Sequence, residues 1–358
     1  MAIRLCKRTL VSLLGLSTVL LGHATIARAQ SFTVFDAPNT NITEVRMIND
    51  RGDVVGVLFD STQSNKVRGF VREAKGSFIV FDAEPEARDT EPVGINARGE
   101  VAGIYIDTSQ NNKGRGFVRG KNGNTTAFDA PNASVTFSSS INARGDVAGN
   151  FGDDAGFREH SFVRDPKGNI VVFDAPNGVP VSGFGPAINA RGDIAGSFYD
   201  ESQGARQRGY VRDWNGSFTI FDTPENTFPW VSGINAGGDI AGYLVDERQG
   251  RKVRGFVRNR GGDITVFDVP NASGTFVTAI NASGDVAGYF GDTTQANKTR
   301  GFVRDMNGDF TVFDPPNASS TVPISINDRG EVAGSFNDTS DGGKRRGFLF
   351  WRDGNASE

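Results

Sequence analysis

The feature that most constrains this chain is a unit of about 46 residues that occurs seven times. One marker is the dipeptide Phe-Asp, which begins at Phe35, Phe81, Phe128, Phe173, Phe221, Phe267 and Phe313. A second marker is Ile-Asn, which begins at Ile48, Ile95, Ile141, Ile188, Ile234, Ile280 and Ile326. Because two independent markers keep one period, we predict a repeat architecture in which each unit is one supersecondary element.

Each unit is expected to form four short strands, because stretches rich in Val, Ile and Phe alternate with Gly, Asn and Asp. The strands of the first unit are expected at 45–49, 53–59, 68–72 and 77–82. Asn49 and Gly52 indicate a tight turn after the first strand, and longer connections are expected at 60–67 and 83–91. Gly56, inside the second strand, indicates a bulge or a close backbone approach.

Seven units of four strands predict an all-β fold, a seven-bladed β-propeller with four-stranded antiparallel blades. The first and last predicted strands indicate how the ring closes. Residues 32–36 form a fourth strand with no other strand of a unit before it, and residues 346–351 form a third strand with no fourth strand after it. The N-terminal strand is therefore predicted to complete the last blade, which removes exposed edges. An open β-solenoid or an array of small domains is the alternative.

The first 29 residues are predicted to be a secretory signal peptide. Basic residues, among them Arg4 and Lys7, precede an apolar run at 10–21, and Ala-Arg-Ala ends at Ala29 as a cleavage site. The protein is therefore expected to be secreted or periplasmic, with one propeller domain at 30–358 and no membrane span after cleavage. An uncleaved membrane anchor is the alternative.

Composition excludes several chemistries. The single cysteine, Cys6, lies in the predicted leader, and His160 is the only histidine beyond it. Disulfides, a cysteine nucleophile and a histidine-based metal cluster are excluded, and Ser-His-Asp catalysis is disfavoured. A net charge of -4 disfavours nucleic acid as a partner. No motif indicates a cofactor or a metal, and we expect a monomer.

A shared carboxylate follows the second strand of each unit. These residues are Asp60, Asp107, Asp153, Asp200, Asp246, Asp292 and Asp338. One interpretation is structural, an Asx turn or a pair with the arginine that opens the third strand. The other is a cation site or a repeated ligand site. The loops lack the Asp-x-Asp-x-Asp-Gly spacing of an EF-hand, which weakens the calcium interpretation.

The position four residues before the shared isoleucine differs between units and is expected at the mouth of the central channel. Its occupants are Glu44, Glu91, Phe137, Phe184, Trp230, Phe276 and Val322. With Arg46 nearby, the mouth is expected to be acidic on one side and aromatic on the other, which suits a sugar. The alternative is that the aromatic residues pack between blades and the glutamates are solvated. A glycosidase would need two carboxylates about 5–10 Å apart, a distance that the sequence does not define.

The repeat resembles a known family of bacterial extracellular proteins. Ile-Asn-x-Arg-Gly-Asp-Val-Ala-Gly, followed after a polar loop by Arg-Gly-Phe-Val-Arg, is similar to the HAF repeat, named for His-Ala-Phe. The nearest literal copy is at 160–163, and most units have Arg-Gly in place of His-Ala. The resemblance covers about residues 32–352. It implies export and a propeller-type fold, and it assigns no activity, ligand or functional residue.

These observations predict an exported, non-catalytic binding scaffold for a glycan or another extracellular polymer or protein. Two alternatives stay open. One is a polysaccharide-active hydrolase or lyase that uses the carboxylates at the channel mouth. The other is a structural or protein-interaction module without a small ligand.

Overall fold

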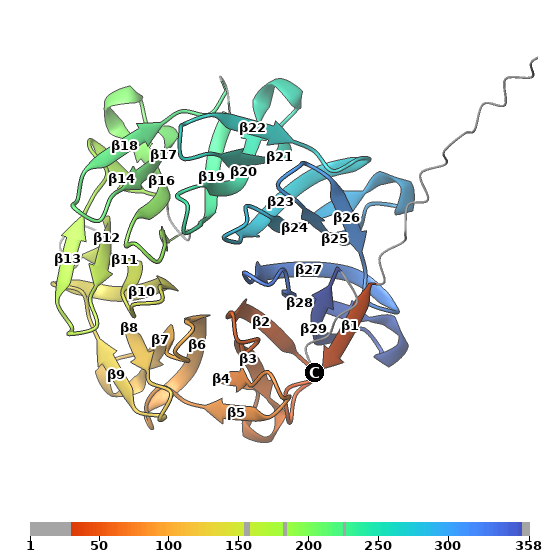
Figure 1. Cartoon of the computed structure of the whole chain (residues 1–358). Coiled ribbons are helices and arrows are strands. Elements are labelled where there is room, and N and C mark those ends of the chain that lie inside the picture. Colours follow the sequence, from red (N-terminus) through yellow and green to blue (C-terminus); the bar gives the residue numbers. More distant parts are fainter. Residues whose placement is uncertain (1–29, 154–157, 182–184, 225–226, 353–358) are drawn as a thin grey trace, which may run out of the picture.

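The computed structural model describes residues 30–153, 158–181, 185–224 and 227–352. In this part of the chain the structure is all-β, with six single turns of 3-10 helix and no α-helix. Seven antiparallel sheets stand around a central opening (Figure 1), which confirms the predicted seven-bladed β-propeller. No helix in the described ranges is long and apolar enough to cross a membrane. The leader predicted at 1–29 lies outside them.

We number the blades 1 to 7 in chain order, and the first strand of each blade lies nearest the centre (Figure 1). The innermost strands are β2 (Thr43–Ile48), β6 (Ala87–Ile95), β10 (Ala133–Ile141), β14 (Gly178–Pro180) with β15 (Ala187–Ile188), β19 (Thr227–Ile234), β23 (Ala272–Ile280) and β27 (Ala318–Ile326). The second strands are β3 (Val54–Asp60), β7 (Val101–Asp107), β11 (Val147–Asp153), β16 (Ile194–Asp200), β20 (Ile240–Asp246), β24 (Val286–Asp292) and β28 (Val332–Asp338).

The third strands are β4 (Lys66–Arg72), β8 (Lys113–Arg119), β12 (Glu159–Arg164), β17 (Arg206–Arg212), β21 (Lys252–Arg258), β25 (Lys298–Arg304) and β29 (Lys344–Trp351). The outermost strands are β5 (Phe78–Phe81), β9 (Thr125–Phe128), β13 (Ile170–Phe173), β18 (Phe218–Phe221), β22 (Ile264–Phe267), β26 (Phe310–Phe313) and β1 (Ser31–Phe35). The 3-10 turns between second and third strands are η1 (Ser61–Gln63), η2 (Thr108–Gln110), η3 (Glu201–Gln203), η4 (Glu247–Gln249), η5 (Thr293–Gln295) and η6 (Thr339–Asp341).

The ring is closed by the N-terminal strand, as predicted. Strand β1 is antiparallel to β29 and is the outermost strand of blade 7, with Ser31 opposite Trp351. Just beyond β1, the Asp36 carboxylate accepts a 2.9 Å hydrogen bond from Nη2 of Arg346. The first and the last described strands, β1 and β29, therefore belong to one blade, and neither is left unpaired.

The connections are shorter than the sequence suggests. The expected loop at 60–67 is one 3-10 turn, because Ser64 and Asn65 adopt left-handed conformations (φ 55° and 61°) that reverse the chain within a few residues. The expected connection at 83–91 ends early, because β6 already begins at Ala87. Its buried Thr90 belongs to the strand although it is polar, and its hydroxyl accepts a hydrogen bond from the backbone of Ala83.

The hydrophobic core consists of seven clusters, and each cluster lies between two neighbouring blades. In one of them, Phe81 of blade 1 packs with Ile95 and Phe117 of blade 2. At six interfaces the arginine that ends or nearly ends a third strand lies over the phenylalanine of the preceding blade, as Arg72 does over Phe35 at 4.8 Å. Such contacts contribute about 0.5–2 kcal/mol each.

Gly56 allows the backbone of β2 and the ring of Phe70 to approach β3 closely. A Cβ atom at Gly56 would lie 2.6 Å from Cζ of Phe70. Opposite Gly56 the pairing shifts by one residue after Val45, so that Arg46 is the extra residue of a bulge. The sequence predicted either a bulge or a close approach at this position, and the structure has both.

One cycle of hydrogen bonds joins all seven blades. The Nδ2 atom of Asn49 donates to the backbone oxygen of Asn96 at 3.0 Å. The equivalent bonds run from Asn96 to Asn142, Asn142 to Asn189, Asn189 to Asn235, Asn235 to Asn281, Asn281 to Asn327 and Asn327 to Asn49, at 3.0–3.2 Å. All seven side chains are buried. We call these residues the asparagine cycle.

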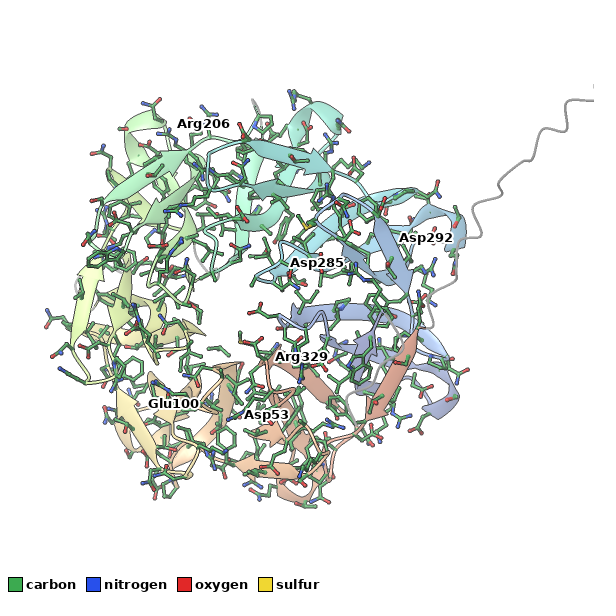
Figure 2. The ribbon with its side chains drawn as sticks, in the orientation of Figure 1. Asp53, Glu100, Arg206, Asp285, Asp292 and Arg329 are labelled. Carbon is green, nitrogen blue, oxygen red and sulfur yellow. The ribbon has the colours of Figure 1, made fainter. Side chains whose placement is uncertain are left out.

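The asparagine cycle also shapes the turns that carry it. Oδ1 of Asn49 accepts the backbone N–H groups of Arg51 and Asp53, and the side chains of Arg51 and Asp53 form an ion pair at 2.6 Å. Equivalent pairs include Arg98 with Glu100. In Figure 2, Asp53 and Glu100 lie nearer the centre of the ring than Arg206 and Asp292 do. The Arg-Gly-Asp and Arg-Gly-Glu sequences are thus parts of the turns.

We predict that Asn142→Ala destabilises the protein by about 2–3 kcal/mol, because it leaves two N–H groups of its own turn without partners and removes one of the two hydrogen bonds to the carbonyl of Asn189. The midpoint of urea unfolding should fall with little change in slope. The control is Asn215→Ala, an exposed residue of another turn. Equal midpoints for both variants would contradict a stabilising role for the cycle.

Deletion of residues 31–36 should lower the melting temperature markedly, because blade 7 loses β1 and the apolar side of β29 meets water. A synthetic peptide with the sequence of residues 30–37, added in excess, should raise the melting temperature again because it fits the vacant edge. Melting is followed by far-UV circular dichroism. An unchanged melting curve after the deletion would show that β1 does not hold the ring closed.

Candidate functional site

The predicted channel-mouth residues lie on innermost strands, inside the strands rather than at their beginnings. Glu91, for example, is the fifth residue of β6. Glu44, Phe137, Trp230 and Phe276 occupy β2, β10, β19 and β23. Phe184 lies outside the described residues. We call the end of the ring that carries η1–η6 the loop face, and the opposite end, with the asparagine cycle, the turn face.

The three charged residues predicted at the mouth are brought together. Nη2 of Arg46 lies 3.5 Å from Oε2 of Glu44 and 3.8 Å from Oε2 of Glu91. On its other side Glu44 lies 3.2 Å from Nε of Arg345, which belongs to the last blade. The result is an alternating chain of two carboxylates and two guanidinium groups, all of them partly exposed, across blades 7, 1 and 2.

Sequence reasoning missed Arg345. The pairing of second and third strands shows its equivalents to be Val67, Gly114, Glu159, Gln207, Val253 and Thr299. Only the last of the seven units has arginine at this position, and a comparison of the units at this position is the signal that would have found it.

The aromatic residues predicted on the other side of the mouth mostly contact further aromatic rings. Trp230 stacks on Tyr243 with ring centroids 6.1 Å apart, and Phe276 stacks on Tyr289 at 4.9 Å. Tyr243 meets the edge of Phe276 at 5.4 Å, which joins both pairs into one row across blades 5 and 6. Burial raises the pKa of Tyr243 to about 12. The two tyrosines were not predicted as site residues. The signal that could have found them is that the other units carry Val, Ile, Asn or Ser at this position.

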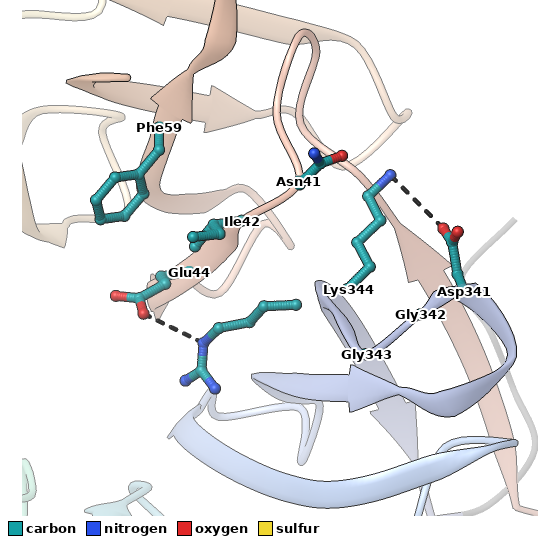
Figure 3. A pocket seen from close by; sticks show the side chains of 9 residues that line it. Asn41, Ile42, Glu44, Phe59, Asp341, Gly342, Gly343 and Lys344 are labelled. Atoms are coloured by element: carbon teal, nitrogen blue, oxygen red, sulfur yellow. Dashed lines mark ion pairs between the residues drawn. The ribbon is translucent and has the colours of Figure 1, made fainter. Parts of the chain in front are cut away.

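A cleft of about 600 Å³ opens on the loop face between blades 7 and 1 (Figure 3). Ile42 and Phe59 form an apolar part of its lining. The rest is strongly charged, because the Arg345–Glu44 pair is accompanied by Lys344 and Asp341, which lie 4.0 Å apart. Of the residues predicted at the channel mouth, Glu44 lines this cleft. Arg46, also predicted there, is not part of the lining and contacts Glu44.

A second cleft, of about 470 Å³, opens on the same face between blades 2 and 3. Phe137 of β10 lies in its lining with 47% of its surface exposed. On the blade 2 side, polar residues of η2 and the turn after it line the cleft together with Ile106. These polar residues are Gln110, Asn111 and Asn112, and they are followed by Lys113 and Gly114. Unlike Trp230 and Phe276, Phe137 has no aromatic ring stacked on it among the described residues.

The turn face offers less for a ligand. A pocket of about 200 Å³ at this end of the channel is lined by the first turn of every blade. The asparagine side chains of these turns already bond one another's blades. Asp50 accepts a hydrogen bond from the backbone N–H of Asp328 at 3.0 Å. The polar groups at this end therefore serve the closure of the ring.

The repeated carboxylates hold the loop-face turns. Oδ1 of Asp60 accepts the backbone N–H and the hydroxyl of Thr62 at 3.0 and 2.6 Å, and Oδ2 accepts a hydrogen bond from Arg68 at 3.2 Å. Arg68 in turn donates to Asp82. The Thr62 hydroxyl, assisted by Arg68, holds the pKa of Asp60 below its ordinary value. These contacts are the Asx turn and the pair with arginine that the structural interpretation of the repeated carboxylates predicted. The described residues contain no group of three His, Cys, Asp or Glu side chains that could hold a metal ion.

Blade 3 replaces this arginine with a histidine. Nδ1 of His160 lies 2.8 Å from Oδ2 of Asp174, and Nε2 lies 3.8 Å from Oδ2 of Asp153. The imidazole ring also packs against Phe151, with centroids 5.3 Å apart. His160 therefore occupies the place of the arginine in the same network of carboxylates, and it does not line either loop-face cleft.

Comparison with known proteins supports the fold and no particular activity. No protein-family model and no curated protein matches the sequence. A virginiamycin B lyase from Staphylococcus aureus, solved with quinupristin, is similar in structure, with a TM-score of 0.57, 15% identity and coverage of 90% of this chain and 100% of the lyase. A puromycin hydrolase gives a TM-score of 0.57 at 12% identity, over 87% of this chain and 55% of the hydrolase. At such identities the likeness defines the class, a β-propeller.

The lowered pKa of Asp292 predicts acid sensitivity. Its folded-state pKa lies below the unfolded value of about 3.9, so the Asp292 carboxylate stabilises the fold above that pH and loses its contribution as the pH falls through the folded pKa. Asp292→Asn should therefore melt below the wild type at pH 7, and the gap should close toward pH 2. The exposed Asp309→Asn is the control and should show no gap. A gap independent of pH would contradict this assignment.

Proposed function

We propose that this chain is an exported, non-catalytic β-propeller that binds a glycan or another extracellular polymer at its loop face. The observation that carries the proposal is the pair of clefts on that face, each of which sets a phenylalanine beside hydrogen-bonding groups. A sugar ring presents C–H groups on its faces and hydroxyl groups on its rim, so that aromatic and polar side chains contact complementary parts of it. Both volumes fall in the range of small-ligand sites, roughly 300–1,000 Å³.

The carboxylates support binding better than catalysis. The catalytic acid of a glycosidase needs surroundings that raise its pKa, so that it stays protonated. The second carboxylate must be free to attack the sugar or to activate a water molecule. Glu44 contacts the guanidinium groups of Arg46 and Arg345, and Glu91 shares Arg46. Carboxylates held in such a chain are suited to orient hydroxyl groups of a ligand.

A protein-interaction role has less support. The most exposed large apolar side chains described are Trp214 in blade 4 and Met306 in blade 6. They stand on separate blades, and single exposed apolar residues are ordinary on a protein surface. Export is supported by the basic and apolar pattern of residues 1–29 and by the resemblance of the repeat to extracellular HAF-repeat proteins.

The proposal is tested by screening the purified protein against immobilised plant and microbial polysaccharides. We expect the wild type to bind at least one of them, and the triple variant Glu44→Ala, Phe137→Ala, Arg345→Ala to lose about tenfold or more in affinity, since each lost contact removes on the order of 1.4 kcal/mol or less. The control is Trp214→Ala, an exposed aromatic residue outside both clefts.

Two outcomes would overturn the proposal. One is an absence of binding to the whole panel. The other is the release of sugar fragments by the wild type that stops in Glu44→Gln or Glu91→Gln, which would establish a polysaccharide-degrading enzyme. Melting curves of all variants confirm that they are folded.

A further inference from the structure

The cleft between blades 2 and 3 differs in chemistry from its counterpart between blades 7 and 1. Of the side chains that line it, only Lys113 carries a charge, and Nζ of Lys113 lies 3.5 Å from Oδ1 of Asp129 in its own blade. No carboxylate is part of the lining. The counterpart is lined by Glu44, Asp341, Lys344 and Arg345. A ligand in the cleft between blades 2 and 3 therefore meets an almost neutral surface.

Blade 2 places three consecutive amide side chains in this cleft. In the other blades whose turn is described, the residues at the same positions are Gln-Ser-Asn, Gln-Gly-Ala, Gln-Gly-Arg, Gln-Ala-Asn and Asp-Gly-Gly. Gln110, Asn111 and Asn112 are all exposed. Among the described residues, the side-chain amides of Gln110 and Asn111 have no hydrogen-bond partner, and Asn112 accepts only one long bond, 3.5 Å, from Arg88.

Space and an apolar surface complete the cleft. Gly114 provides no side chain at the position where the last blade carries Arg345. Across the cleft, the exposed Phe137 stands on β10 without a stacked partner among the described residues. An amide group both donates and accepts hydrogen bonds, which is what a hydroxyl group requires, and the ring of Phe137 offers a flat apolar face.

We infer that the cleft between blades 2 and 3 is a subsite for an uncharged sugar residue, which lies against Phe137 while Gln110, Asn111 and Asn112 bond its hydroxyl groups. This inference rests on the proposed function and deepens it, because it assigns the ligand class and the cleft. Charged sugars are disfavoured here, since neither a carboxylate nor an unpaired basic group is available to neutralise them.

The test is calorimetric titration of the full chain with two sets of hexasaccharides. The neutral set contains oligomers of glucose, mannose, xylose and N-acetylglucosamine, and the charged set contains oligomers of galacturonate and of glucosamine. We expect one or more neutral oligomers to bind. Phe137→Ala should weaken that binding about tenfold or more, and the double variant Asn111→Ala, Asn112→Ala should weaken it by a similar factor.

The chain itself shows that the alanine substitutions are compatible with the turn. Ala296 and Ala205 occupy the positions of Asn111 and Asn112 in blades 6 and 4, with the same left-handed backbone (φ 53° and 60°). Asn65→Ala is the matched control, because Asn65 stands at the position of Asn112 in blade 1 and lines neither cleft. It should leave binding unchanged.

The outcomes separate this inference from the proposed function. The inference fails, and the function stands, if only charged oligomers bind, or if neutral binding survives in Phe137→Ala and in the double variant but is lost in Arg345→Ala. Both fail if no oligomer or polysaccharide binds. Equal losses in the double variant and in Asn65→Ala would also overturn the inference, because they would reveal a general effect on the turns.

Discussion

The contact between neighbouring blades is the interaction on which the whole structure depends. A four-stranded blade has two apolar faces, and it is stable only when a neighbouring blade packs on each of them. Seven clusters, one at each interface, provide that cover. The asparagine cycle adds a polar bond at the inner edge of each interface. Because buried polar groups need partners, each asparagine satisfies a turn in its own blade and a carbonyl in the next. A cycle of this kind has no end, so a displaced blade disturbs both of its neighbours.

The fold could be predicted almost completely because its determinants lie within one unit and are repeated. In the sequence alone, the turn asparagine, the strand glycine and the unpaired first and last strands indicate blades, bulges and closure of the ring. The partners in the candidate site could not be predicted in the same way. Arg345 meets Glu44 only because the ring closes, and Tyr243 meets Phe276 only because blades 5 and 6 pack face to face. The end of the connection at 83–91 was misplaced because a buried polar strand, such as that around Thr90, lacks an apolar pattern.

The turn face and the loop face of the ring differ in which of their residues the closure of the ring requires. At the turn face the Asn side chains repeat in every blade and bond within and between turns, and five of the seven blades add an Arg–Asp or Arg–Glu pair. A substitution there disturbs the closure of the ring. At the loop face the repeated Asp and Arg residues hold the turns, as Asp60 and Arg68 do in blade 1. The residues between this Asp and this Arg differ from blade to blade, as Gly114 and Arg345 do. Variation at the loop face therefore changes what the surface offers without removing a contact that the ring requires. This division is the physical reason for proposing the ligand site at the loop face.

Each loop-face cleft is built by two blades, one of which gives the turn and the other the innermost strand. The chemistry of a cleft is therefore a property of a pair of units. Arg345 with Glu44 makes one cleft ionic, whereas Asn111 with Phe137 makes the other neutral. A polymer that crosses the mouth meets charges on blades 7, 1 and 2 and uncharged aromatic groups on blades 3, 5 and 6. On the proposed function, we expect such an unequal surface to bind an asymmetric polymer better in one direction than in the reverse, because reversal changes which groups of the polymer meet the charged and the aromatic sectors. The residues that the units share build the ring, and the positions where the units differ make the two sides of its loop face chemically different.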